Sequence, residues 1–320
     1  MDFPQLHVGI GQQFGPFTIF PVWSDTPGNL GLTTGAHAQL QVTELAAGPQ
    51  VNRLTVANTG AKPALLIEGE LLEGGHQHRI AAESRILAPG EHADVPAFCV
   101  EEGRWGGPSI QHGRRARRAP LHVRAELAGL GGLSGSTGDG VRTLRAADQG
   151  RVWQRVGRFS AGVSATGSLV EAYDGFDTAA SGFDSASLRS TPGVLEGQRG
   201  VVVGLGGRAL TLELFGTSAL FARHWEQFAD ALRFEAAHAE LLAAQPTRGQ
   251  GARDFVAGLA TDPRRLFATP TTAHGAVAST PVRAAVGRYA YSGLAVQRAA
   301  GPAQFAHLSV WDATHPLAAL

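Results

Sequence analysis

Between residues 6 and 105 the chain is divided into short extended segments, and this pattern limits the fold more than any other feature of the sequence. Clusters of turn-forming residues separate the segments: TPGN, AAGP, NTGAKP, EGG and APGE. Strands of this length and spacing are typical of an antiparallel sandwich or a small barrel. The six segments are residues 17–23, 36–45, 51–58, 64–72, 76–84 and 92–101.

The second half of the chain mixes helical and extended patterns. Apolar spacing predicts a helix at residues 146–162, and a second short helix is expected to end at Gly175. Gly206 and Gly207 lie between two apolar runs and predict a hairpin. A nucleotide-binding loop would be followed by a helix, whereas a second strand follows these glycines. A long amphipathic helix is predicted at residues 217–243, and two strands end the chain.

Together these patterns predict an α+β protein. We expect an N-terminal antiparallel β-sandwich or barrel-like domain at residues 1–105 and an α+β domain at residues 146–320. The intervening residues 106–145 are rich in glycine and arginine, and they predict a connection. The arginine cluster at residues 114–118 could bind an anion, but it is interpreted as a solvated surface or a helix flank.

Composition restricts the partners of this chain. Acidic and basic residues balance at 27 each, so no net charge attracts nucleic acid or an anionic membrane. Cys99 is the only cysteine, which excludes an intramolecular disulfide and a thiolate-rich zinc site. No secretion signal is recognisable at the N-terminus, and no segment approaches the roughly 18 apolar residues of a membrane span. We expect a cytoplasmic protein with no cofactor, and the oligomeric state is left open.

Residues 74–90, GGHQHRIAAESRILAPG, match the spacing of the first metal-binding motif of cupin barrels. His76, His78 and Glu83 would supply the ligands of a non-haem metal. The second cupin motif is missing, and Glu83 falls on the opposite strand face from the two histidines. A metal-dependent cupin-like enzyme is therefore an alternative hypothesis, and the favoured interpretation has no metal.

The same stretch predicts a hairpin with a two-residue glycine turn at 74–75. Glu70 would then face Arg79, and alternation would place Glu68, Glu70, Gln77 and Arg79 on one face. Such a face is either a ligand site or an exposed surface that carries a cross-strand Glu70–Arg79 ion pair. The assignment depends on the length of the turn.

A second dense cluster, CVEEGRW, covers residues 99–105. Glu101 lies near the end of a predicted strand, and the glycine that follows permits a turn that presents Arg104 and Trp105. A guanidinium beside an indole can hold a planar or phosphorylated ligand. The alternative is a strand end with a Glu–Arg pair and a packed tryptophan. Cys99 is a doubtful nucleophile, because a lone buried cysteine usually fills space.

Several motifs resemble a bacterial domain family named for its association with ADP-ribosylglycohydrolases and rhodanese/phosphatase-superfamily proteins. The resemblance covers most of the chain and rests on ALLIEGELLEGGHQHR, SRILAPGEHADVPAFCVEEGRW, VSATGSLVEAYD, GVVVGLGGRALTLELFG and HLSVW. The residues that fit the family pattern are Glu68 to Glu70, Gln77, Arg79, Cys99 to Trp105 and His307. Family members often have lysine and asparagine where this chain has His76 and His78. The resemblance implies a role near NAD or ADP-ribose metabolism, without a defined reaction.

The leading hypothesis is a protein that binds, and if chemistry occurs processes, an anionic small molecule of the nucleotide or ADP-ribose class. Its proposed ligand-binding residues are Glu68, Gln77, Arg79, Arg104 and Trp105, with the arginines on phosphate and the tryptophan stacked on a ring. Glu70 and Glu101 are the candidate general bases. Besides the cupin-like enzyme, the other alternative is a non-enzymatic interaction module that docks a protein partner. Whether the chain is an enzyme is left open.

Overall fold

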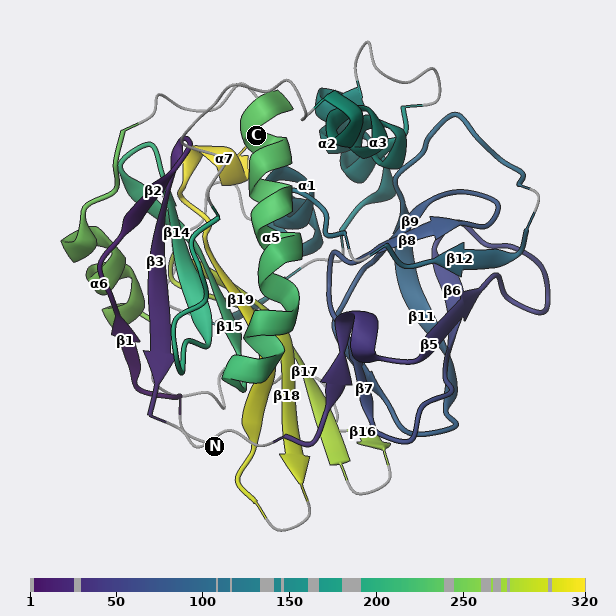
Figure 1. Cartoon of the computed structure of the whole chain (residues 1–320), viewed down its shortest axis with the longest axis horizontal. Coiled ribbons are helices and arrows are strands. Elements are labelled where there is room, and N and C mark those ends of the chain that lie inside the picture. Colours follow the sequence, from purple (N-terminus) through teal and green to yellow (C-terminus); the bar gives the residue numbers. More distant parts are fainter. Residues whose placement is uncertain are drawn as a thin grey trace.

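The computed structural model describes most of the chain, and Figure 1 shows its arrangement as a small barrel beside a large sheet. The described residues are 3–25, 30–107, 109–115, 117–132, 141–144, 147–160, 167–179, 191–238, 245–259, 266, 272–274, 277–298 and 301–319. The predicted connection at 106–145 therefore lies partly outside the described residues.

Most of the first part of the chain forms a closed barrel of six antiparallel strands, one of the two architectures predicted for it. The predicted segment 17–23 lies outside this barrel, and one barrel strand, residues 111–113, falls in the predicted connection. The strands follow one another around the barrel in the order β11, β6, β5, β12, β8 and β9. Short apolar side chains fill the interior, and every one of the core residues is buried. Barrel closure removes the free edges that isolated short strands would expose. The bounds are β5 Leu40–Thr43, β6 Arg53–Asn58, β8 Leu71–Gly74, β9 Arg79–Ala81, β11 His92–Cys99 and β12 Gln111–Gly113.

A ten-stranded sheet forms the other part. Its main path runs β1, β3, β14, β15, β19, β18, β17 and β13, with β2 beside β3 and β16 beside β17. The bounds are β1 Leu6–Val8, β2 Gln12–Phe14, β3 Phe17–Ser24, β13 Val141–Thr143, β14 Gly200–Leu205, β15 Arg208–Phe215, β16 Thr272–His274, β17 Val277–Val286, β18 Tyr289–Arg298 and β19 Gln304–Asp312.

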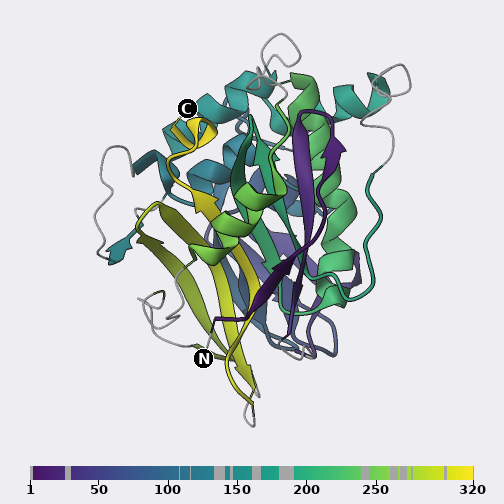
Figure 2. The same ribbon diagram turned by 90° about the vertical axis from the view of Figure 1, so that its left-hand side faces the viewer.

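Helices cover both faces of this sheet. The long helix α5, Ser218–His238, packs its buried stripe against one face, as Figure 1 shows. Helix α6, Gly249–Ala257, packs on the opposite face and lies in front of the sheet in Figure 2. Because both faces are covered, the central strands β14 and β15 are almost completely buried.

A third core joins the barrel to the helices. The outward-facing side chains of β8 and β9 pack against α1 Leu121–Leu127, α2 Gln149–Ser160 and α3 Leu169–Ala179. A small three-stranded sheet lies between the parts, with β7 Ala64–Leu66 flanked by β10 Arg85–Leu87 and β4 Thr33–Thr34. The remaining short helices are η1 Gly35–His37, η2 Leu130–Gly132 and α7 Pro316–Ala319.

The structure confirms the α+β class and most of the predicted elements. The helix expected at 146–162 is α2, and the glycine turn at 206–207 joins β14 to β15 as a hairpin. The helix that was expected to end at Gly175 continues to Ala179, so that boundary was wrong. One isolated glycine weakens a helix by only about 1 kcal/mol, which the packing of α3 outweighs.

The expected division at residues 105 and 146 stays a prediction. The sheets cross it, because β1, β2 and β3 belong to the large sheet and not to the barrel that follows them in sequence. Within the described part of the chain, no helix is both long enough and apolar enough to span a membrane.

Candidate functional site

The hairpin at the start of the predicted site has a different register from the expected one. The structure pairs Leu72 with Arg79 and Leu71 with Ile80, so Glu70 does not face Arg79 and the expected ion pair was wrong. The turn is two residues longer than a 74–75 glycine turn allows. The shift by two residues keeps Arg79 on its expected side, because faces alternate with a period of two.

Glu68 and Glu70 are both buried, but they precede β8 in the chain and lie outside the barrel. Glu70 pairs with the guanidinium of Arg114, whose Nε lies 2.8 Å from Glu70 Oε1. The same guanidinium donates to the backbone oxygens of Ala38 and Gly35. Glu70 therefore anchors the loop before α1 rather than facing Gln77 or Arg79.

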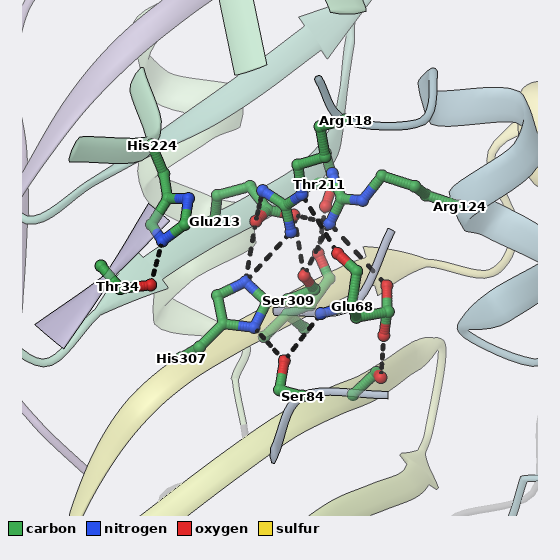
Figure 3. A network of polar contacts seen from close by, with 12 residues as sticks. Thr34, Glu68, Ser84, Arg118, Arg124, Thr211, Glu213, His224, His307 and Ser309 are labelled. Carbon is green, nitrogen blue, oxygen red and sulfur yellow. Dashed lines mark hydrogen bonds and ion pairs between the residues drawn. The ribbon is translucent and has the colours of Figure 1, made fainter. Parts of the chain in front are cut away.

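Glu68 belongs to a buried polar network between the barrel and the large sheet, drawn in Figure 3. The strands β15 and β19 pair with Glu213 opposite Ser309 and Phe215 opposite His307, which brings the polar side chains of both strands to one face. Arg118 and Arg124 reach the same place from the start of α1 and its interior. Residues from four distant segments therefore meet at one point.

Glu213 is the centre of this network. Arg118 Nη1 lies 2.9 Å from Glu213 Oε2, and Arg124 donates to the other carboxylate oxygen. Ser309 Oγ donates to Glu213 Oε1 at 2.7 Å, and His307 Nε2 lies 3.1 Å from Oε2. The carboxylate is thus surrounded by donors on both oxygens, as a buried carboxylate requires.

These contacts set the protonation of the network. Burial alone would raise the pKa of Glu213, but the charges of Arg118 and Arg124 and the bond from His307 hold that pKa well below its ordinary value. Burial and the neighbouring Arg124 lower the pKa of Arg118 to about 10. Burial also lowers the pKa of His307, against the opposing effect of Glu213. At neutral pH the network therefore has a charged Glu213, a charged Arg118 and a neutral His307.

A serine, a histidine and a glutamate follow one another in this network, since Ser84 Oγ lies 2.9 Å from His307 Nδ1. Serine hydrolases use the same three residue types. Here, however, Ser84 is 4% exposed, and His307 and Glu213 are 0% and 1% exposed. The guanidiniums that neutralise Glu213 also contact aromatic rings, with Arg124 over Phe228 and Trp311. A set of groups closed off in this way joins the two parts of the protein, and it offers no surface to a substrate.

The other predicted residues meet at one end of the barrel. In the strand register Arg79 lies between Leu72 and Cys99, and alternation places it on the interior face with Ala81 and Ala97. His112 is opposite Val42 on the interior face of β12. Glu44 follows β5 two residues after Val42, so it points the same way. Polar side chains therefore point into the barrel at this end, next to the apolar residues that fill the rest of its interior.

Arg79 is the least satisfied of these side chains. It has no exposed surface, and its Nη2 donates to the backbone oxygen of Gln50 at 3.3 Å. Its Nε and Nη1 have no hydrogen-bond partner, and within the described residues no carboxylate oxygen lies at ion-pair distance. Burial lowers its pKa, while the carboxylates of Glu44 and Glu101 oppose that change. The equally buried Arg118 and Arg124, by contrast, both pair with Glu213.

Glu44 and His112 form a second buried pair at this end. Glu44 Oε1 accepts the backbone N–H of His76 at 2.9 Å and lies 3.2 Å from His112 Nε2. His112 Nδ1 lies 3.2 Å from Leu72 O. Glu44 Oε2 is buried without a hydrogen-bond partner. Burial lowers the pKa of His112 despite the bonds to Leu72 and Glu44.

The rim of the barrel holds the remaining predicted residues together. Both Nε and Nη2 of Arg104 approach Glu101 Oε2, at 2.8 and 2.7 Å. Gln77 Nε2 donates to Glu101 O at 3.2 Å and to Arg104 O. The backbone N–H of His78 also donates to Glu101 Oε2 at 3.2 Å. The Gln77, Glu101 and Arg104 part of the predicted constellation therefore forms one connected cluster.

Trp105 extends from this cluster into solvent. Its side chain is 55% exposed, and its ring centroid lies 5.9 Å from the ring of His76 at a tilt of 46°. Arg104 beside it is 28% exposed. An exposed indole next to a partly exposed guanidinium and an imidazole is a surface on which a planar group can stack.

The metal alternative finds no support in the geometry. Within the part of the chain that the structure describes, no three His, Cys, Asp or Glu side chains come together as a metal site. His78 Nδ1 accepts the backbone N–H of Gly74 at 2.8 Å, which directs its other nitrogen to Glu101. Burial raises the pKa of Glu83, and the charges that oppose this change are those of Arg85 and Arg283.

A comparison with family profiles identifies the chain. The profile ARPP-1, described as the ARG and Rhodanese-Phosphatase-superfamily-associated Protein domain, matches residues 5–311. The chain belongs to this family. The resemblance seen in the sequence is thereby confirmed, and its motifs supply members of both clusters: Glu68, Glu213 and His307 in the network, and Gln77, Arg79 and Arg104 at the barrel end. No curated protein and no solved structure matches the chain.

Sequence reasoning missed several residues of these clusters. Glu44 and His112 were not singled out, although a glutamate at the end of a barrel strand is a signal that could have found the first. Arg118 was interpreted as part of a solvated surface or a helix flank; it does flank α1, but it is 1% exposed. Arg118 differs from its neighbours by lying directly before the apolar start of α1, which carries it inward.

Proposed function

We propose that this protein binds a small anionic molecule of the nucleotide or ADP-ribose class at the polar end of its barrel. The observation that carries the proposal is Arg79, a guanidinium with no exposed surface that has no carboxylate partner and two unpartnered nitrogens among the residues that the structure describes. Most buried charges are paired, and an unpaired one requires an explanation. A bound anion would supply the missing partner of Arg79, and the rest of such a ligand would contact the exposed rim.

Trp105 supports the aromatic part of this proposal. An indole that is 55% exposed beside the His76 ring provides a face for a base, and stacking of this type contributes about 1–3 kcal/mol. Arg104 is the partly exposed cation of the rim, and Glu101 fixes its direction. Gln77 holds the loop that carries both residues by binding the oxygens of Glu101 and Arg104.

Glu101 is the one residue for which we propose a catalytic role. This carboxylate lies in the rim cluster and contacts His78 and Arg104. Glu70 and Glu68 contact Arg114 and the buried network, and neither makes a contact with the rim. We therefore propose Gln77, Arg79, Arg104 and Trp105 as ligand-binding residues and Glu101 as the only candidate base. The name of the family is consistent with an ADP-ribose-related context.

Calorimetric titration tests the proposal. AMP, ADP, ADP-ribose and NAD are titrated into the wild type, into Trp105→Ala and into Leu195→Ala, which removes an exposed side chain elsewhere. The wild type and Leu195→Ala are expected to bind one of these ligands alike, and Trp105→Ala is expected to bind roughly tenfold more weakly. If the wild type binds none of the four ligands, the proposal is wrong.

A further inference from the structure

At the barrel end, unpartnered hydrogen-bond donors lie on one side of the barrel and an unpartnered acceptor lies on the opposite side. Arg79 lies on β9 and Glu44 at the end of β5, and these strands are three positions apart in both directions around the six-stranded barrel. Arg79 offers the N–H donors of Nε and Nη1, whereas Glu44 offers the acceptor Oε2, and all three atoms are buried without a hydrogen-bond partner. A group that contacts both must accept from Arg79 and donate to Glu44.

His112 determines the charge of the Glu44 wall. Its Nδ1 faces Leu72 O at 3.2 Å, and a carbonyl oxygen only accepts, so Nδ1 carries a hydrogen. Its Nε2 lies 3.2 Å from Glu44 Oε1, and these two acceptor atoms attract each other only with a proton between them. The pair of Glu44 and His112 is then uncharged overall, whichever of the two atoms holds that proton.

The other titratable groups at this end also cancel. Glu101 and Arg104 form an ion pair at 2.7 Å. Burial raises the pKa of the Cys99 thiol, and burial lowers the pKa of His78, so both are uncharged at neutral pH. The remaining charge is the single positive charge of Arg79. The missing group therefore has one negative charge, at least one acceptor atom for Arg79 and one donor for Glu44.

From this inventory we propose that the barrel end binds the singly protonated phosphate of a phosphomonoester, with anionic oxygens on Arg79 and the P–OH donating to Glu44 Oε2. The inference rests on the proposed function and specifies which group of the ligand enters the barrel. A sulfate ester has the charge but no proton for Glu44. An amide has the N–H donor but no charge for Arg79. A carboxylic acid has either the charge or the proton, but never both.

Entry of the phosphate requires the rim to open. The backbones of Gly75 and Gly107 approach so closely that a Cβ on Gly107 would lie 2.1 Å from Gly75 O. The N–H of Gly106 also donates to His76 O at 3.1 Å. Gly75 lies against His112 and Glu44, so these two segments close the barrel end there and must separate before a ligand reaches it.

Methyl phosphate and methyl sulfate are the matched probes for this inference, because they differ mainly in the ionisable proton. Each is titrated calorimetrically into the wild type at pH 6 and pH 8. We expect methyl phosphate to bind more tightly than methyl sulfate at pH 6 by roughly tenfold or more, since the loss of one buried hydrogen bond has an effect of this size. The second pKa of a phosphomonoester lies near about 6, so its affinity should decrease between pH 6 and pH 8.

Glu44→Gln provides the specific control. The amide of glutamine can donate to an unprotonated sulfate oxygen, so the variant is expected to lose the preference for phosphate over sulfate. Should this buried substitution unfold the protein, the wild-type comparison still decides the inference.

The outcomes separate this inference from the proposed function. Equal or tighter binding of methyl sulfate by the wild type overturns the inference. So does the absence of methyl phosphate binding when a nucleotide binds in a Trp105-dependent manner, and in that case the proposed function stands. Selective binding of methyl phosphate without binding of any nucleotide keeps the phosphate site and rejects the nucleotide class. If no probe and no nucleotide binds, both are wrong.

Discussion

Arg118 and Glu213 lie 95 residues apart in the sequence and meet at 2.9 Å inside the protein, where neither side chain is more than 1% exposed. Arg118 precedes α1 and bridges to Glu70 at the edge of the barrel, whereas Glu213 lies in the centre of the large sheet. The pair therefore links the two parts of the fold through one buried carboxylate.

Replacing Glu213 with glutamine is expected to destabilise the protein strongly. The substitution removes the carboxylate that pairs with both Arg118 and Arg124 and leaves Glu68, 3.9 Å from Arg124, as their remaining buried counter-ion; breaking comparable buried pairs costs about 3–5 kcal/mol. Urea unfolding measures the free energy of unfolding of the variant. Glu226 is exposed on α5, the helix that covers the network. The substitution Glu226→Gln should change the free energy of unfolding by less than about 0.5 kcal/mol. Equal effects of the two substitutions would show that the network contributes little.

Acid should destabilise the protein in two stages. Burial lowers the folded-state pKa values of His224 and His307, so the stability they contribute is complete above the unfolded value of about 6.5 and decreases as the pH falls below it. Glu213 has a lowered folded pKa, so its contribution is complete above about 4.3 and decreases at lower pH. Urea midpoints measured from pH 8 to pH 4 check this. A flat profile between pH 7 and pH 5 contradicts the first stage.

Gly75→Ala is expected to disturb the barrel end more than Gly90→Ala does. Both glycines have positive φ, at 59° and 75°, so alanine is strained at either position. A Cβ on Gly75 would lie 2.1 Å from His112 Nε2 and 2.7 Å from Glu44 Oε1, whereas a Cβ on Gly90 would meet nothing within 4 Å. The extra overpacking should cost about 1–3 kcal/mol, measured as the difference between the two free energies of unfolding. Equal values would place the 75 loop farther from His112.

Cys99 should react slowly with thiol reagents in the native protein. Its side chain is buried, and burial raises the pKa of the thiol, so little thiolate is present or accessible at pH 8. The rate of reaction with an aromatic disulfide reagent is compared in the native protein and in urea. We expect a native rate at least about tenfold lower than the denatured rate. Similar rates in both states would show that the barrel end is already open.

The sequence predicted the barrel, the hairpin at Gly206 and the helix over Val152 to Phe159, because their patterns are local. It did not predict which acid meets which arginine. Glu70 pairs with Arg114 rather than with Arg79. The hairpin turn is longer by two residues, and Glu70 precedes β8, the strand with which the chain returns to the barrel. Such pairings depend on the relative placement of segments far apart in the chain, as with Arg118 and His307, which are 189 residues apart. Local spacing contains no information about them.

The candidate site, like the fold, could be predicted from the sequence only in part. The run from Cys99 to Trp105 and the nearby Gln77 do form one cluster, as expected from their density in the sequence. Glu44 and His112 join the barrel end only because closure of the barrel brings β5 opposite β9 and β12 within two strands of it. A linear pattern cannot indicate which side chains face each other across a barrel.

Nuclear magnetic resonance of the arginine and tryptophan side chains tests most directly that the barrel end binds a nucleotide. Arg79→Lys and Trp105→Phe assign the Nε–H resonances of Arg79 and Trp105, and AMP is then added to the wild type. We predict that both resonances shift with the same saturation curve, because Arg79 gains an acceptor and Trp105 gains a stacked base. Saturable AMP binding that leaves both resonances unchanged, or the absence of any shift at millimolar AMP, would contradict the proposed site.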